Sequence, residues 1–125
     1  MILGLGTDII EIFRIKASIE RHLGAFLEHV FTPDELAEAS KRKDRMQYYA
    51  GRWAAKEALS KALGCGIGVS CGWHDICILN GLHGAPEMTI SGKALETASK
   101  MGLKKIHVSI SHEKRYAAAT VILEN

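Results

Sequence analysis

The sequence predicts a single α+β domain over residues 1–125. The 125 residues include 47% apolar and 24% charged ones, the balance of a globular chain with room for one core. Helical and strand patterns alternate irregularly, without repeated strand–helix units. Two strand patterns near the end of the chain, joined by a short connection, indicate an antiparallel hairpin.

The chain begins with a short, largely buried strand at Ile2–Ile9, where nearly every residue is apolar. Gly4 and Gly6 lie inside this strand and allow close approach of another backbone. A first helix is expected to follow, through about His22, because apolar residues recur at helical spacing.

A second helix is expected after Thr32, which can act as its N-cap. Pro33 suits the first helical position, and Glu35 can complete a capping box. The longest helical pattern extends over Arg45–Leu63 and ends at Gly64, where a left-handed cap is expected.

Short strands and one helix are expected in the second half of the chain. In order they are a strand near Trp73–Leu79, a turn through Asn80-Gly81, a strand near Glu87–Ile90, a helix from Ser91 to Gly102, and strands near Lys105–Ser111 and Tyr116–Leu123.

Charge and cysteine content exclude several classes of function. Sixteen Lys and Arg against fourteen Asp and Glu give a net charge of +2, too small to indicate a nucleic-acid partner. No apolar run is long enough to span a membrane. The spacing of Cys65, Cys71 and Cys77 fits no zinc site. We therefore expect a cytoplasmic protein with free thiols.

Two acidic residues are the first candidates for chemistry. Glu57 falls on the apolar face of the long helix, where a carboxylate is costly unless it pairs or binds a cation. Asp8 ends the first strand. Structural explanations exist for both, since Glu57 and Lys61 form an i,i+4 pair and Asp8 is a favoured helix cap. Together the carboxylates suit Mg²⁺ with phosphate oxygens, for which Lys61 and Arg52 are fitting partners.

Three weaker features keep two interpretations each. The basic run 41–45 can meet a phosphate or form a solvated face. The Gly-rich loop 64–68 can approach an extended ligand or simply cap the helix. His107 and Ser109 share one face of a strand, which is a structural surface or a polar strip facing an anion.

Two motifs together resemble a known family. Gly6-Thr7-Asp8-Ile9-Ile10-Glu11 and the segment from Arg52 to Lys61, R-W-A-A-K-E-A-L-S-K, are similar to the two signatures of holo-[acyl-carrier-protein] synthase, the short bacterial type of 4′-phosphopantetheinyl transferase. Further matches follow in the same order along the whole chain. They are Phe31-Thr32 with Glu35, Gly64-x-Gly66-Ile67, Gly84-Ala85-Pro86, His107-Val108-Ser109-Ile110-Ser111-His112 and Tyr116-Ala117.

This resemblance implies an antiparallel sheet packed with a long helix, assembled into a homotrimer with sites in the clefts between subunits. It also implies a reaction. The serine hydroxyl of apo acyl carrier protein attacks the β-phosphorus of coenzyme A, phosphopantetheine moves to the serine, and adenosine 3′,5′-bisphosphate leaves. The product supports fatty acid biosynthesis.

The resemblance also implies roles for particular residues. Asp8 and Glu57 match the Mg²⁺ ligands, and Lys61 would hold phosphate oxygens. We expect Glu57 to be the general base through a water on the metal, and rank Asp8 second for that role. The residues expected at coenzyme A are Arg52, Lys61, Gly64, Gly66, Lys43, Arg45, Pro86, His107 and Ser109, with His107 serving a neighbour's site. Those expected at the acidic carrier protein are Arg14 and Arg21.

Two other classes of function compete with this transferase. A non-catalytic module that binds phosphate or RNA would need only the basic run and the Gly-rich loop. An inactive homologue, or one domain of a fused synthase, would keep the scaffold without the activity. Asp8 and Glu57 favour the transferase over the binding module, because a pure anion binder gains nothing from two carboxylates beside its phosphate unless a metal lies between them.

Overall fold

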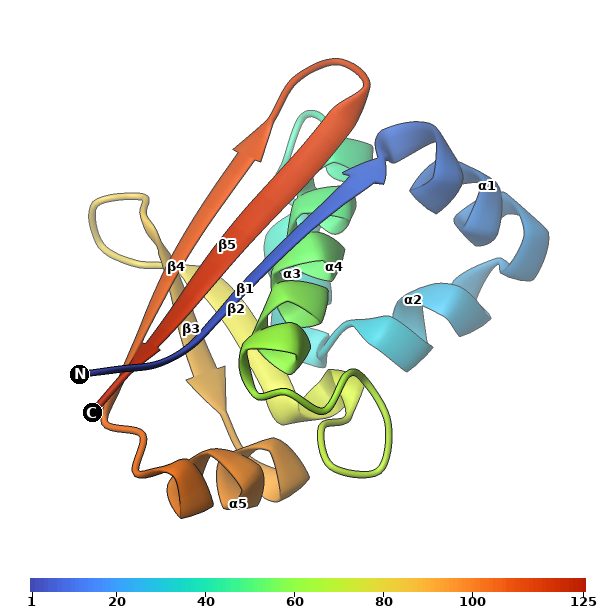
Figure 1. The fold of residues 1–125 in the computed structure, drawn as a ribbon. Helices are drawn as coiled ribbons and strands as arrows, with labels where there is room; N and C mark the ends of the chain where they lie inside the picture. The colour runs from blue at the N-terminus through green and yellow to red at the C-terminus, as the bar shows by residue number, and fades with distance from the viewer.

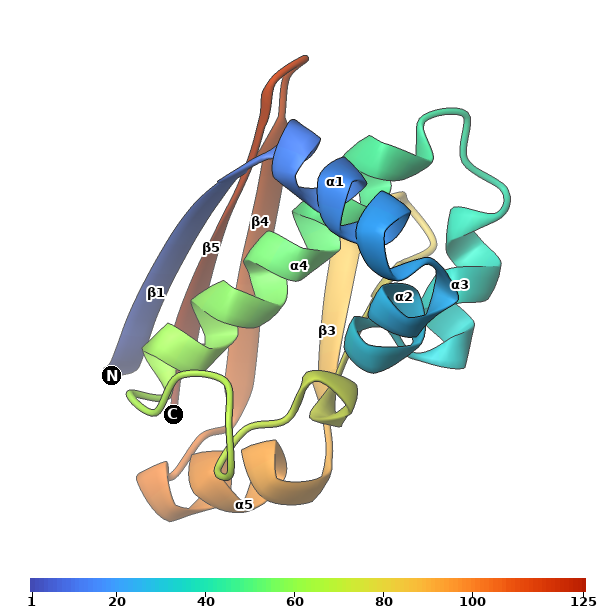
Figure 2. The same cartoon turned by 90° about the vertical axis from the view of Figure 1, so that its right-hand side faces the viewer.

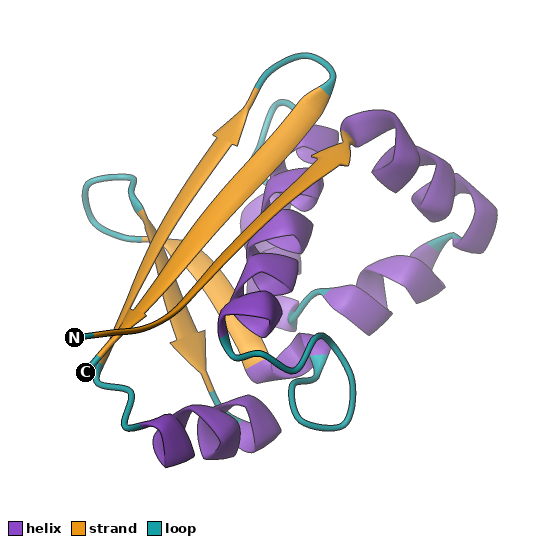
Figure 3. Cartoon of the chain, in the orientation of Figure 1, coloured by secondary structure: helices purple, strands orange, loops and turns teal.

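The computed structural model describes all residues 1–125 and mixes helices with strands along the chain (Figures 1 and 3), which confirms the predicted α+β class. None of the helices is both long and apolar enough to cross a membrane. In chain order the elements are β1 (Ile2–Glu11), α1 (Ile12–His22), α2 (Gly24–Val30), α3 (Pro33–Ala39), α4 (Arg45–Ala62), the 3₁₀ turn η1 (Trp73–Asp75), β2 (Ile76–Asn80), β3 (Pro86–Ile90), α5 (Gly92–Met101), β4 (Lys105–His112) and β5 (Tyr116–Glu124).

β1, β5 and β4 form an antiparallel sheet with β5 in the centre. The predicted hairpin is confirmed, because β4 pairs directly with β5 and places Ser109 opposite Thr120. β1 pairs with the other edge of β5, where Thr7 also lies opposite Thr120. β2 and β3 form a separate antiparallel pair. The first and last strands are thus neighbours, and Met1 and Asn125 are hydrogen-bonded to each other.

α4 covers one face of the three-stranded sheet, and no helix covers the other (Figure 2). Ala58 and Leu59 of α4 and Val121 and Leu123 of β5 are all fully buried in the same core. Side chains alternate along a strand, so the residues between these on β5 face the bare side. We call this bare side, formed by alternate residues of β1, β5 and β4, the outer sheet face.

The predicted helix ends are confirmed in detail. The Thr32 hydroxyl accepts a hydrogen bond from the Glu35 N–H at 3.2 Å, and the Glu35 carboxylate accepts one from the Thr32 N–H at 2.9 Å. Before α4, the Asp44 carboxylate caps the helix by accepting the Gln47 N–H at 3.1 Å. Gly64 ends α4 with a φ of 81°, the left-handed conformation that favours glycine.

The strand expected from Trp73 is wrong at its start. Trp73–Asp75 form a 3₁₀ turn, and β2 begins only at Ile76. The Asp75 carboxylate explains the turn, because it accepts the backbone N–H of Gly72 at 3.0 Å and that of Ala94 at 3.1 Å. These two bonds bend the backbone at the place where the strand was expected to start.

Candidate active site

Gly4 and Gly6 bring β1 into direct contact with the last turns of α4. A Cβ atom on Gly6 would overlap the carbonyl oxygen of Ala58, and one on Gly4 would overlap that of Ala62. A side chain at either position would push strand and helix apart. Asp8 lies two residues further along, so it faces α4 as the glycines do. The glycines thus place the Asp8 carboxylate beside the helix.

Lys61 reaches from α4 to Thr7 and Asp8 within β1, which continues to Glu11 and so does not end at Asp8 as expected. Its Nζ lies 2.9 Å from Asp8 Oδ1 and 3.1 Å from the Thr7 carbonyl oxygen. The Lys61 side chain is half exposed, and an ion pair of this kind contributes only about 0.2–1 kcal/mol to stability. The second Asp8 oxygen, Oδ2, is buried and makes no hydrogen bond. Burying this oxygen without a partner lowers the stability of the fold.

Glu57 lies one turn before Lys61 on α4, close enough to Asp8 for their charges to interact. Burial raises the pKa of the Glu57 carboxyl, the negative charge of Asp8 raises it further, and Lys61 opposes both effects. Two carboxylates that disfavour each other's charge create a place for a cation. The geometry thus supports chemistry that uses these three side chains together.

The structural explanations for these acidic residues do not hold. Lys61 forms its ion pair with Asp8 and makes none with Glu57. Asp8 does not cap the following helix, because the N-cap of α1 is Glu11 and no side chain caps it. Neither carboxylate is thus accounted for by a local helix interaction.

The donor set fits a magnesium ion. The buried Asp8 Oδ2 has no hydrogen-bond partner, and the negative charge of Asp8 acts on the nearby Glu57 carboxyl. No third His, Cys, Asp or Glu joins them to form a larger cluster. Mg²⁺ commonly uses one or two carboxylates and completes its six positions with water and phosphate oxygens. The two carboxylates therefore match the number and type of protein ligands that Mg²⁺ commonly uses.

A cavity of about 390 Å³, which we call the basic pocket, lies at the first turns of α4. It brings together Lys43, Arg52 and Pro86, three of the residues singled out from the sequence. Arg45 does not line it. Its lining residues are Arg42, Lys43, Asp44, Gln47, Tyr48, Gly51, Arg52, Asn80, Gly84, Pro86, Ile110 and His112.

Arg52 is held within the basic pocket and is not brought to Lys61. Its Nη2 donates to Asn80 Oδ1 at 2.8 Å and to Glu38 Oε1 at 3.2 Å. Its guanidinium lies over the Tyr48 ring, 4.3 Å from the ring centre. These contacts fix the positive charge of Arg52 at the wall of this pocket, whereas Lys61 contacts Asp8 of β1.

Arg42 and His112 also line the basic pocket. Arg42 belongs to the basic run expected to meet a phosphate and pairs with Glu38 at 2.8 Å, whereas His112, at the end of β4, was not expected at this site. Arg45, which was selected, donates to the Ser40 carbonyl oxygen at 3.3 Å outside the pocket. The basic run contained a signal for Arg42, but periodicity could not tell which of its cations face inward.

His107 and Ser109 lie on the outer sheet face, away from both groups of residues. His107 Nε2 lies 2.9 Å from Glu124 Oε1, and this hydrogen bond lowers the pKa of the Glu124 carboxyl. Leu5 and Ile9 of β1 are exposed on the same face. Within one chain, therefore, His107 and Ser109 are not brought to the basic pocket or to Glu57.

A second cavity, of about 280 Å³, is lined by both Arg14 and Arg21 of α1; we call it the α1 groove. Aromatic side chains, which were not expected at a partner site, also line the groove. The groove is lined by Ile10, Phe13, Arg14, Ile15, Ala17, Ser18, Arg21, Phe26 and Trp53. An apolar surface flanked by two arginines suits an acidic protein partner.

Gly64 and Gly66 form the turn that ends α4. Both have a positive φ, 81° and 69°, and the N–H groups of Cys65 and Gly66 donate to the Ser60 carbonyl oxygen at 3.2 and 3.1 Å. A helix cap thus accounts for the conformation of these glycines. Their contact with a ligand remains a prediction.

Comparison with known proteins supports one family. The family model of the 4′-phosphopantetheinyl transferase superfamily matches residues 4–121. Among curated relatives, "Holo-[acyl-carrier-protein] synthase" of Vibrio parahaemolyticus is 47% identical over 124 residues, covering 99% of this chain and 98% of that protein.

Solved structures agree with this match. The holo-[acyl-carrier-protein] synthase of Neisseria meningitidis superimposes with a TM-score of 0.93 at 33% identity, over 100% of both chains. That of Helicobacter pylori, in complex with coenzyme A, has a TM-score of 0.85 at 33% identity, covering 96% of this chain and 99% of the other. The chain belongs to the 4′-phosphopantetheinyl transferase superfamily.

Proposed function

We propose that this chain is a holo-[acyl-carrier-protein] synthase, which moves 4′-phosphopantetheine from coenzyme A to a serine of apo acyl carrier protein. The observation that carries this proposal is the placement of Asp8, Glu57 and Lys61 together in a chain whose full-length relatives have that name. The activity would supply fatty acid biosynthesis in the cytoplasm. The three free cysteines fit such a reducing compartment.

Asp8 and Glu57 would hold Mg²⁺ between them. The partnerless Oδ2 of Asp8 and the charge interaction between the carboxylates support this assignment. When bound, the ion would offset the negative charge of the coenzyme A pyrophosphate.

Glu57 is the proposed general base. The serine oxygen of the carrier attacks the β-phosphorus, the bond from that phosphorus to the bridging oxygen breaks, and adenosine 3′,5′-bisphosphate leaves with the bond's electrons. Glu57 accepts the proton of the serine hydroxyl through an intervening water.

Lys61 would bind the phosphate oxygens of coenzyme A. Its side chain is half exposed, and its ammonium group donates to Asp8 and to the Thr7 carbonyl oxygen, which hold the charge at the site. The third proton of the ammonium group is free to donate to a ligand oxygen. A flexible lysine acts here as a point charge beside the transferring group.

The basic pocket is the proposed place for the adenosine end of coenzyme A. Arg42, Lys43 and Arg52 concentrate positive charge in a cavity large enough for part of a nucleotide, and Pro86 adds an apolar wall. Arg45 lies beside this cluster as a further cation for the 3′-phosphate. Gly64 and Gly66 would let the backbone approach the rest of the molecule.

The proposal includes a homotrimer with each site in a cleft between subunits. Leu5 and Ile9 are 64% and 66% exposed on the outer sheet face, which favours coverage by another copy. His107 and Ser109 lie on this same face, so they would reach the coenzyme A that a neighbouring copy holds. In a trimer, His107 and Ser109 would thus contact coenzyme A, which they do not reach within a single chain.

The α1 groove is the proposed docking place of the acidic carrier protein. Arg14 and Arg21 would pair with its carboxylates, mainly setting the encounter rate and the register of the complex. Phe13 is 73% exposed beside them and would give the apolar contact.

Intact mass spectrometry of an apo acyl carrier protein tests the proposed function. The carrier is incubated with the protein, coenzyme A and Mg²⁺, with EDTA replacing the metal in a parallel sample. We expect the mass of one phosphopantetheine to be added to the carrier only when Mg²⁺ is present. No addition to any of several apo carriers would contradict the proposal and favour a binding module or an inactive homologue.

A further inference from the structure

A buried lysine in the middle of α4 has no part in the proposed chemistry. Lys56 precedes Glu57 and is fully buried. Its Nζ donates to Glu35 Oε1 at 2.7 Å, to the Val30 carbonyl oxygen at 2.8 Å and to that of Trp73 at 3.0 Å. An ammonium group has three protons, and all three are used within the protein. Lys56 can therefore act only through the groups it holds.

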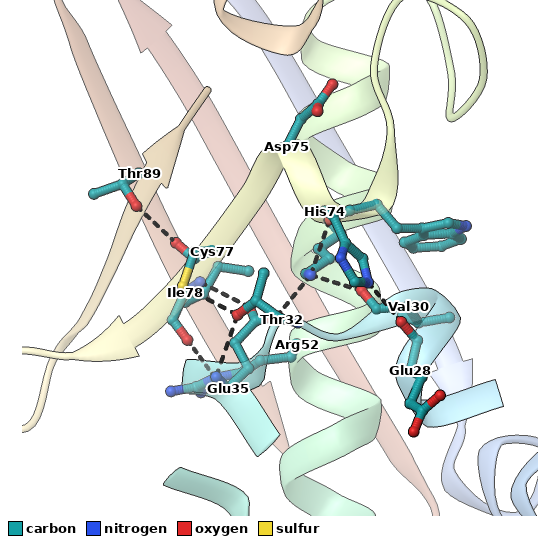
Figure 4. A network of polar contacts seen from close by, with 12 residues as sticks. Glu28, Val30, Thr32, Glu35, Arg52, His74, Asp75, Cys77, Ile78 and Thr89 are labelled. Carbon is teal, nitrogen blue, oxygen red and sulfur yellow. Dashed lines mark hydrogen bonds and ion pairs between the residues drawn. The ribbon is translucent and has the colours of Figure 1, made fainter. Parts of the chain in front are cut away.

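Glu35 makes this lysine's charge tolerable in the core, and Figure 4 shows the Glu35 side chain beside Thr32 and Ile78. Its Oε1 also accepts the Thr32 N–H at 2.9 Å, and its Oε2 accepts the Ile78 N–H at 2.8 Å. Every oxygen and proton of the pair is thus satisfied, as a buried ion pair requires. The bonds to the two carbonyl oxygens are separate from this neutralisation and need another explanation.

The two carbonyl groups belong to elements that shape the α1 groove. Val30 is the last residue of α2, and Phe26 of the same helix lines the groove. The Trp73 ring lies 5.7 Å from the ring of Trp53, which lines the groove from α4. One ammonium group therefore connects α2, which lines the groove through Phe26, and the turn η1, whose Trp73 ring packs behind the groove residue Trp53, to the helix that bears Glu57.

We infer that Lys56 is a positioning residue for the carrier protein, whose bonds to Val30 and Trp73 keep the α1 groove in the shape that docks the carrier beside Glu57. The inference rests on the proposed function, which assigns that groove to the carrier. The contacts of Asp8 and Lys61 are made through β1 without Lys56. Loss of the two bonds should thus affect carrier binding more than chemistry.

Two variants separate the ion pair from the carbonyl bonds. Glu35→Gln removes the carboxylate charge, keeps the capping box, and leaves Lys56 with enough protons for both carbonyl oxygens. The double variant Glu35→Gln, Lys56→Met keeps a chain of similar volume but removes both carbonyl bonds. Lys56→Met alone would leave the Glu35 carboxylate buried and unpaired, and Glu35→Gln leaves the Lys56 ammonium unpaired. The double variant removes both charges, so a loss of carrier affinity beyond that of Glu35→Gln comes from the carbonyl bonds and not from an unpaired charge.

Steady-state kinetics with apo carrier protein gives the first readout. For the double variant we expect the KM for the carrier to rise about tenfold over that of Glu35→Gln, with kcat and the KM for coenzyme A within about twofold. A purely structural role would lower the active fraction, so kcat alone would fall. An unchanged carrier KM, a fall in kcat alone, or an unfolded double variant by circular dichroism would each overturn the inference.

Hydrogen–deuterium exchange of the free protein gives a readout that needs no activity. We expect faster amide exchange over residues 24–31 and 72–76 in the double variant than in Glu35→Gln, and equal exchange in β1 and β5. Equal exchange over 24–31 and 72–76 would overturn the inference even if the kinetics changed. If the wild-type chain transferred no phosphopantetheine, the proposed function would fail, and exchange would still show whether Lys56 holds these segments.

Discussion

Gly6 lies against the backbone of Ala58 with no room for a side chain between β1 and α4. Neither residue has chemistry of its own, yet their contact fixes how far Asp8 on the strand lies from Glu57 and Lys61 on the helix. The position of the proposed catalytic groups thus depends on two small residues in the core.

Gly6→Ala should therefore weaken the fold and the activity together. The added Cβ would meet the Ala58 carbonyl oxygen, so we expect the free energy of unfolding to fall by about 1–3 kcal/mol and turnover to fall as Asp8 moves away from Glu57. Urea unfolding and kcat measure the two effects. Gly24→Ala is the control, because a Cβ there meets no atom and should add about 0.4–1 kcal/mol. Equal losses in both variants would contradict the close contact.

Lys61→Ala should raise the coenzyme A requirement with little effect on the fold. The pair joins a half-exposed Lys61 to an Asp8 side chain that is 12% exposed, so we expect its loss to lower the free energy of unfolding by about 1 kcal/mol, the upper end of the range for exposed pairs. Removing the charge beside the phosphates should raise the KM for coenzyme A by about tenfold or more. An unchanged affinity for coenzyme A, measured by calorimetry, would end the phosphate role of Lys61.

Tyr48→Phe should change stability at high pH. Burial raises the pKa of Tyr48 from 10.0 to about 12, so the folded chain keeps a proton that the unfolded chain loses between these values. The wild type therefore loses stability as the pH rises from about 10 to about 12, and the variant lacks this loss. At pH 7 the variant should be at least as stable, since the Tyr48 hydroxyl has no hydrogen-bond partner. Urea unfolding of the wild type and the variant at pH 7 and pH 11 measures these free energies. If both proteins lost the same stability between the two pH values, the raised pKa of Tyr48 would be contradicted.

Ile9→Glu should separate the subunits of the proposed trimer. Ile9 is 66% exposed on the outer sheet face, so a charge there leaves the single chain folded but cannot be buried against another copy. Light scattering after size exclusion should give three chain masses for the wild type and one for the variant, with equal circular dichroism. A wild type with the mass of one chain would contradict the trimer, and so would a variant that keeps three.

Local signals made much of the fold predictable. Thr32 and Glu35 form the expected capping box, Gly64 takes the expected left-handed conformation, and the C-terminal strands pair as a hairpin. Each of these depends on neighbours within a few residues. α2 was not predicted, because no side chain caps it and seven residues carry little periodicity. The turn at Trp73 depends on the Asp75 carboxylate, which accepts the N–H of the nearby Gly72 and that of the distant Ala94, and no local pattern contains the second bond.

The candidate site was predictable in its residue types and only partly in its geometry. Asp8 and Glu57 stood out because carboxylates occupied apolar positions, and the glycines before Asp8 indicated the close backbone. Arg52 was expected beside Lys61, but its contacts with Asn80 and Glu38 come from elements distant in sequence. The role of Lys56 could not be inferred from its helix, since all three of its acceptors lie outside α4.

The turnover of Glu57→Gln tests the central claim most directly. Intact mass spectrometry would follow the modification of apo carrier protein at saturating Mg²⁺ by the wild type, Glu57→Gln and the exposed control Glu96→Gln on α5. Since the raised pKa disfavours the charged form of Glu57 in the fold, the glutamine variant should fold at least as well. We expect its turnover to fall by about 10²–10⁴-fold, with the control unchanged. Near-normal turnover of a folded Glu57→Gln would contradict its role as base and metal ligand.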